Sequence, residues 1–340
     1  MVFEEEWSGD WWVPPDGRLV PRKLARAIVA NRSILVVGDS TARRLTATMA
    51  LQLVGDTSPQ GAENEYFLTM GGHGHLDWTN HLPTLRRYVP SLRFEYLDLF
   101  HKIHRRYCTE KGTFMQTPDV LVVATGLHHL GIDSRFGRNS RNLTTYIPTL
   151  VEIANELVAG LGCVCQKLKP GGILVWRTIP PIGGTHGIGN MSNADLRADR
   201  NAVLQNIALT NDQALLLNRM VLDLIFCREP ALRTANRSIS GPGAVPRSEL
   251  KQHHACLSSR LRVADFGRSM LRHNAGDPAN KLSALPPASL LPHYNNLARS
   301  IELQLTYRAI LNWTAAGPAM LPCVTWPGIP LYSVAWHPLM

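Results

Sequence analysis

Apolar residues along this chain occur in short unbroken runs, and the segments between the runs carry apolar residues at helical spacing. The clearest run is Ile34–Val37, four aliphatic residues with no polar residue among them. Such a run is typical of a strand buried on both faces of a parallel sheet. The pattern predicts strands at about 33–38, 65–70, 93–99, 119–125, 172–178 and 260–266.

Helical periodicity occupies several of the intervals between these strands. Its longest example extends from Tyr146 to Leu168 and stops at Pro170 and two glycines, residues that end a helix. Alternating strands and helices predict an α/β fold, a three-layer α/β/α arrangement around a central, mostly parallel sheet. The expected helices lie near 41–54, 143–168, 211–226 and 293–313.

The predicted elements form one domain over residues 33–315. Residues 1–32 are rich in tryptophan and proline and are expected to form an irregular arm. The stretch 227–259 is expected to be a long connection, and residues 316–340 a proline-rich tail.

Composition narrows the class of protein. Of the 340 residues 45% are hydrophobic, yet no window approaches eighteen consecutive apolar residues, so no transmembrane helix is expected. The first residues are acidic where a signal peptide would be basic. The net charge of +9 is scattered along the chain, which favours a solvated basic surface over a nucleic-acid interface.

Cysteines and glycosylation sequons bear on the compartment. Cys163 and Cys165 are separated by a single residue in a predicted helix, which is no zinc or redox spacing, and disulfides among the other four cysteines stay open. Five Asn-x-Ser/Thr sequons hint at a secretory lumen without settling the compartment. They begin at Asn31, Asn142, Asn190, Asn236 and Asn312.

Ser40 is the candidate nucleophile of the chain. It follows the first buried strand across Gly38 and Asp39 and precedes a predicted helix. Open α/β folds place their ligands at this edge of the sheet, and the start of a helix favours negative charge. The structural alternative is that Ser40 only caps the helix. A serine nucleophile needs a base, and His293, just before the last predicted helix, could reach back over the same edge.

The Gly38-Asp39-Ser40 turn and the histidine before the last helix together resemble the SGNH, or GDSL-type, esterase and acyltransferase superfamily. The chain is most similar to its PC-esterase branch, which includes the trichome-birefringence-like polysaccharide O-acetyltransferases and the lumenal domain of sialic-acid O-acetyltransferases. The resemblance covers about residues 7–312 and implies a flavodoxin-like sheet with Ser40 as nucleophile. It also implies an oxyanion hole built from the backbone of Gly74 or Gly72 and from His128, which stands where the superfamily has asparagine.

The sequence departs from the family pattern at the acid of the Ser–His–Asp catalytic triad. That pattern is Asp-x-x-His before the last helix, and here Leu290 occupies the place of the aspartate. Asp277 or another loop acid could orient His293, the site could work as a Ser–His dyad, or the chemistry could be impaired. Asp98 and His101 also spell Asp-x-x-His, but they follow the third predicted strand, where a structural acid and a surface histidine are the favoured interpretation.

Arg177, the histidines near strand ends and the glycine-rich run 183–189 are further candidate parts of a site. Arg177 ends the fifth predicted strand, and the resemblance implies contact with substrate or acyl donor; a structural ion pair is the alternative. Histidines near strand ends have no spacing diagnostic of a metal site, and the run 183–189 lacks a phosphate-loop lysine.

The resulting prediction is a serine esterase or O-acyl transferase that acts on an acetylated carbohydrate or small ester through an acyl-enzyme. It requires no metal ion and no organic cofactor, although a transferase requires an acyl donor. The alternative is a non-catalytic SGNH-like module that binds a glycan or a protein partner.

Overall fold

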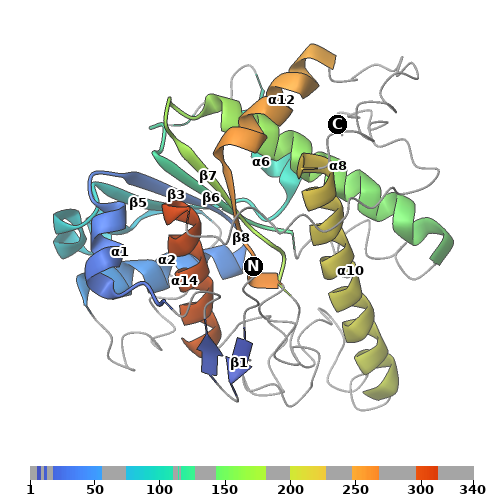
Figure 1. Cartoon of the computed structure of the whole chain (residues 1–340), viewed down its shortest axis with the longest axis horizontal. Helices are drawn as coiled ribbons and strands as arrows, with labels where there is room; N and C mark the ends of the chain where they lie inside the picture. Colours follow the sequence, from blue (N-terminus) through green and yellow to red (C-terminus); the bar gives the residue numbers. More distant parts are fainter. Residues whose placement is uncertain are drawn as a thin grey trace.

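The computed structural model describes residues 6–8, 11–13, 18–55, 74–109, 114, 116–126, 143–180, 200–226, 247–267 and 296–312 (Figure 1). Within them the chain forms an α/β fold around one six-stranded sheet. A separate antiparallel pair, β1 (Glu6–Ser8) and β2 (Trp11–Val13), precedes that sheet.

The main sheet has the strand order β4-β5-β3-β6-β7-β8. Every neighbouring pair is parallel except β4 with β5, so β4 is an antiparallel edge strand. Without β4, the first parallel strand of the chain lies between the second and the third, one of the two common orders of doubly wound sheets. The strands are β3 (Ser33–Gly38), β4 (His75–Asp77), β5 (Ser91–Tyr96), β6 (Val120–Ala124), β7 (Ile173–Arg177) and β8 (Leu261–Ala264).

Alternate residues of the parallel strands enter two separate hydrophobic cores, one on each face of the sheet. Ile34 and Val36 of β3 belong to one core, and Leu35 and Val37 belong to the other. The unbroken apolar run thus has the cause expected from the sequence, burial on both sides. The two cores place the sheet as the middle of three layers.

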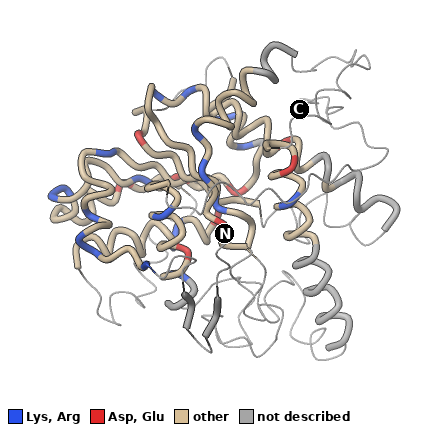
Figure 2. Tube along the Cα trace, in the orientation of Figure 1, with Lys and Arg blue, Asp and Glu red and all other residues tan. Residues whose placement is uncertain are grey.

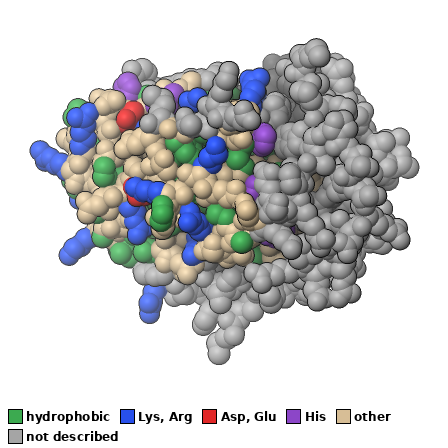
Figure 3. All heavy atoms as spheres, turned by 90° about the horizontal axis from the view of Figure 1, so that it is seen from above, with side chains coloured by type: hydrophobic (Ala, Val, Ile, Leu, Met, Phe, Trp, Pro, Cys, Tyr) green, Lys and Arg blue, Asp and Glu red, His purple; other side chains and the backbone are tan. Residues whose placement is uncertain are grey.

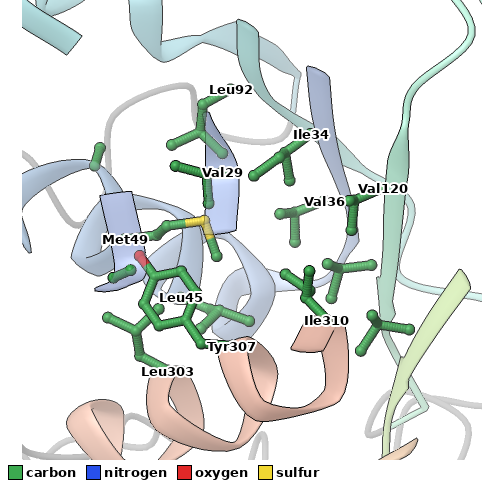
Figure 4. Close-up of a cluster of buried hydrophobic side chains, with 14 of the residues drawn as sticks. Val29, Ile34, Val36, Leu45, Met49, Leu92, Val120, Leu303, Tyr307 and Ile310 are labelled. Carbon is green, nitrogen blue, oxygen red and sulfur yellow. The ribbon is translucent and has the colours of Figure 1, made fainter. Parts of the chain in front are cut away.

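Helices on the first face are α1 (Arg22–Val29), α2 (Ser40–Val54) and α14 (Asn296–Leu311). In Figure 4, Leu303 and Tyr307 of α14 lie near Leu45 and Met49 of α2, while Ile310 lies beside the strands. The second face carries α6 (Phe100–Tyr107), α8 (Leu143–Lys167), α10 (Arg200–Phe226) and α12 (Arg247–Arg260).

The predicted elements agree with the structure in the core of the domain and differ at its margins. Strand β3 has the predicted bounds, and four other predicted strands correspond to β5, β6, β7 and β8; the sixth, at 65–70, lies outside the described residues. Helix α10 begins at residue 200 rather than 211. The expectation of irregular structure is wrong for α1, and that of a long connection is wrong for α12.

Short elements around the second parallel strand were not predicted. They are β4, α5 (Trp78–His81), the 3-10 helix η1 (Pro83–Arg87) and α6. No helix among the described residues is long and apolar enough to cross a membrane.

Two disulfides cross-link the helices of the second face. Cys108 at the end of α6 is joined to Cys163 of α8, and Cys165 of α8 is joined to Cys256 of α12. The two α8 cysteines are two residues apart and therefore project in different directions from the helix. The close spacing that excludes a zinc or redox motif serves instead to attach α8 to a helix on either side.

Candidate functional site

The turn between β3 and α2 is held by Asp39 rather than by the serine. The Asp39 carboxylate caps the helix: Oδ1 accepts a hydrogen bond of 2.8 Å from the Thr41 backbone N–H and one of 2.6 Å from the Thr41 hydroxyl. Ser40 is the first residue of the helix and is partly buried. The alternative in which Ser40 serves as the cap is therefore wrong, and its hydroxyl is not used for capping.

This turn lies where the connections of the sheet change sides. The chain leaves β3 into α2 on the first face, whereas the helix between β6 and β7 is α8 on the second face. The carboxyl ends of β3 and β6 are thus the switch point of the sheet, the place where open α/β sheets bind ligands. Gly126, just after β6, has φ +132°, a conformation that favours glycine.

Small residues surround the last row of the sheet at this edge. Gly38 pairs with Tyr96 on one side and with Ala124 on the other, and Arg177 pairs with Ala264. A Cβ at Gly38 would lie 2.0 Å from the Ala124 carbonyl oxygen, so the strands meet here with no room for a side chain. Glycine is required at this position by close approach rather than by an unusual backbone angle.

Arg177 is the charged member of that row, and it is fully buried, with 0% of its surface exposed. Its Nη2 donates a hydrogen bond of 2.9 Å to Thr41 Oγ1, and its Nη1 lies 3.1 Å from Oε1 of Glu302 on α14. Two interpretations of Arg177 were open, a substrate contact and a structural ion pair. The structure has the ion pair, and the buried guanidinium presents no surface to a substrate.

Burial also governs the ionisation of the groups around the turn. Desolvation raises the pKa of Glu302 to about 7; the Asp39 charge acts in the same direction, and Arg177 and Arg299 oppose it. The pKa of Tyr96 is raised to about 12, chiefly by burial and then by Asp98 and Asp39. Tyr96 is therefore a neutral phenol at ordinary pH.

Gly74, the predicted glycine of the oxyanion hole, lies beside the carboxyl end of β5. Gly74 accepts a backbone hydrogen bond of 2.9 Å from Tyr96, and it directly precedes β4. The predicted strand at 65–70, which Gly74 was expected to follow, lies outside the described residues. Gly74 still reaches the carboxyl edge, since β4 runs antiparallel to β5. It is two strand spacings, roughly 10 Å, from Gly38.

The remaining predicted residues of the site lie outside the described residues: His293, Asp277, His128, Gly72 and the run 183–189. Asp98, the acid of the second Asp-x-x-His, is paired with Lys102 at 2.6 Å, and its backbone carbonyl accepts a hydrogen bond from Thr125. These contacts favour the structural interpretation of Asp98. Among the residues that the structure describes, no group of three metal-ligating side chains lies together.

Sequence reasoning missed Glu302, the partner of Arg177. A weak signal was present, because an arginine that ends an otherwise apolar strand requires an acid from another element.

The basic side chains elsewhere are dispersed over several elements, including α1, η1 and α6 (Figures 2 and 3). Comparison of the chain with models of known protein families, with curated proteins and with solved structures finds no match.

Proposed function

We propose that this protein is a serine-dependent acyl-ester hydrolase or O-acyl transferase with Ser40 as its nucleophile. The observation that carries the proposal is the place of Ser40, at the switch point of the sheet and in the first turn of a 15-residue helix whose cap is supplied by a different residue. The parallel strands have the flavodoxin-like order, and the sequence blocks around Ser40 resemble the SGNH superfamily.

The amino terminus of α2 suits the chemistry of acyl transfer. The backbone N–H groups of its first turn and the helix dipole favour the negative charge that develops on the carbonyl oxygen when Ser40 Oγ attacks an ester. The backbone N–H groups of Ser40 and Gly74, with His128, are the proposed oxyanion donors. Loss of one such donor typically raises the barrier by roughly 2.7–4 kcal/mol.

The direction of α14 supports His293 as the base. Glu302 of α14 lies against Arg177 at the carboxyl edge, while Ile310 packs in the core between α14 and the sheet. The helix therefore starts at the edge that carries Ser40, and its first residue, Asn296, precedes Glu302 by about 9 Å of helix. We therefore propose that His293, three residues before Asn296 in the sequence, accepts the Ser40 proton.

Labelling with a fluorophosphonate probe tests the proposal. We expect the wild-type chain to form a covalent adduct at Ser40 that is absent in Ser40→Ala and slowed strongly in His293→Ala. Ser91→Ala is the matched control, because Ser91 is a buried serine at the start of β5, at the edge of the sheet opposite to the one that carries Ser40. Absence of labelling, or labelling that persists in Ser40→Ala, refutes the enzyme.

Leu290 in the place of the expected acid favours the second candidate, a non-catalytic module of the same fold that binds a glycan or a protein partner. For an active chain, release of acetate from a panel of O-acetylated sugars, with and without an alcohol acceptor, distinguishes hydrolysis from transfer. An acylated alcohol among the products identifies a transferase, and free acetate alone identifies an esterase.

A further inference from the structure

A buried chain of polar contacts connects helix α14 to the two residues that flank Ser40. Glu302 Oε1 lies 3.1 Å from Arg177 Nη1, and Arg177 Nη2 donates at 2.9 Å to Thr41 Oγ1. The Thr41 hydroxyl then donates at 2.6 Å to Asp39 Oδ1, the oxygen that also accepts the Thr41 backbone N–H. Three elements from distant parts of the sequence thus meet at one turn.

We propose that Arg177 and Glu302 are positioning residues for Ser40: the ion pair holds the Thr41 hydroxyl, and with it the Asp39 cap, so that the Ser40 hydroxyl has one fixed direction at the edge of the sheet. The inference rests on the proposed function, since it assigns the pair a role in the reactivity of Ser40. It assigns neither residue any contact with the substrate.

Geometry restricts what this arginine can do. Successive residues of β7 lie on opposite faces of the sheet. Val175 belongs to the core on the α14 side, so Arg177, two residues later, lies on the same face. Its partner on β8 is Ala264, a residue with a small side chain. A planar group with several donors can engage a hydroxyl and a carboxylate at once, whereas a lysine cannot bridge them in the same way.

Stability alone does not account for the pair. Both side chains are almost entirely out of solvent, at 0% and 2% exposure, and desolvation of two charges offsets much of their attraction. Apolar residues of similar volume often stabilise such a site as well or better. The contact that an apolar replacement would lose is the hydrogen bond to Thr41, and this bond acts on the turn that carries the nucleophile.

A double variant separates positioning from stability. In Arg177→Met with Glu302→Leu, neither member of the buried pair is left without the other, so we expect a thermal unfolding midpoint close to that of the wild type. We expect the rate of fluorophosphonate labelling at Ser40 to fall about 10- to 100-fold, the range that a small misplacement of a reacting group produces. With an ester substrate kcat should fall while KM stays within about threefold, because the pair touches no substrate.

Conservative and matched variants sharpen the test. Glu302→Gln retains an oxygen that can face Arg177, and labelling should stay within about threefold of the wild type. Arg93 is another buried arginine, and it lies within β5, away from the turn. Its side chain donates a hydrogen bond to the backbone carbonyl of Gln116. Arg93→Met should lower the unfolding midpoint and leave the labelling rate of the folded protein unchanged.

Hydrogen exchange gives a readout that does not depend on activity. The Thr41 amide is bonded to Asp39, and its exchange in the folded protein should accelerate at least tenfold in the double variant. A double variant with wild-type Thr41 exchange or wild-type labelling overturns the positioning role while Ser40 remains a nucleophile. A wild-type chain that is never labelled overturns the proposed function instead, and Thr41 exchange then still decides whether the pair holds the turn.

Discussion

Replacement of Gly38 by alanine is the most direct test of the packing at the candidate site. The added Cβ would lie 2.0 Å from the carbonyl oxygen of Ala124 and 2.7 Å from the Cβ of Ala42. The first contact is with backbone of the neighbouring strand, which cannot rotate away as a side chain can. Strand β3 and helix α2 must therefore shift relative to β6 by about 1 Å to bring this contact to the 3.0 Å at which real Cβ contacts begin.

The cost can be set from this geometry. Overpacking of a well-packed interior typically destabilises by roughly 1–3 kcal/mol, and three forced contacts, two of them with backbone atoms, place Gly38→Ala at about 3 kcal/mol. Glycine at position 160 provides the matched control. It lies inside helix α8, where a Cβ meets nothing within 4 Å. Gly160→Ala should stabilise by about 0.5–1 kcal/mol, the usual gain for alanine over glycine in a helix.

Urea unfolding with the disulfides intact measures both changes, as shifts of the midpoint at constant slope. Fluorophosphonate labelling of the same samples reports on the turn, and Gly38→Ala should slow it because Ser40 is two residues from the shift. The packing argument is refuted if Gly38→Ala costs less than about 1 kcal/mol, or if the two alanine variants change stability in the same direction.

Three further predictions follow from other parts of the structure. Burial raises the pKa of Glu302 from 4.5 to about 7, so the folded chain holds a proton that the unfolded chain releases, and stability falls as pH rises through this window; relative to Glu302→Gln in urea titrations, the wild type should lose roughly 2–3 kcal/mol between pH 5 and pH 8. Cys165→Ser opens the disulfide to Cys256, which spans 91 residues, and should cost about 2–5 kcal/mol against the wild type in non-reducing buffer; an equal unfolding midpoint would contradict this disulfide. Asn31 and Asn312 are exposed and begin sequons, so the full chain secreted from a eukaryotic host should lose mass on treatment with an N-glycosidase. Asn31→Gln and Asn312→Gln should each reduce this loss of mass. A mass that the enzyme leaves unchanged would show that neither asparagine is glycosylated.

The sequence predicted the elements whose residues are buried by a regular pattern. Strand β3 was located to the residue because both of its faces are covered, which favours the unbroken apolar run of its four central residues. Helix α12 was missed for the opposite reason. Its segment is polar, and of its described residues only His253 and Leu257 are buried. The disulfide at Cys256 helps to hold it against α8, a contact that no local periodicity records.

The candidate site divides in the same way. Ser40 was identifiable because a buried strand, a glycine and a helix start are all local features. Asp39 as the cap was missed, since Asp39 and Ser40 are both favourable capping residues and the sequence does not decide between them. Glu302 was missed because it is 125 residues from Arg177 in the chain, and an acid in a helix is most often a solvated one.

The two faces of the sheet are secured by different means, and the difference matters for the site. Both disulfides lie among α6, α8 and α12, on the face away from α2. A disulfide acts mainly by restricting the unfolded chain, and it does not direct the orientation of a distant turn. On the other face, the turn that carries Ser40 is held by directional contacts in addition to the hydrophobic core, from Glu302 through Arg177 to Thr41. Reduction of the disulfides should therefore lower global stability, while the geometry of the Ser40 turn persists for as long as the chain stays folded.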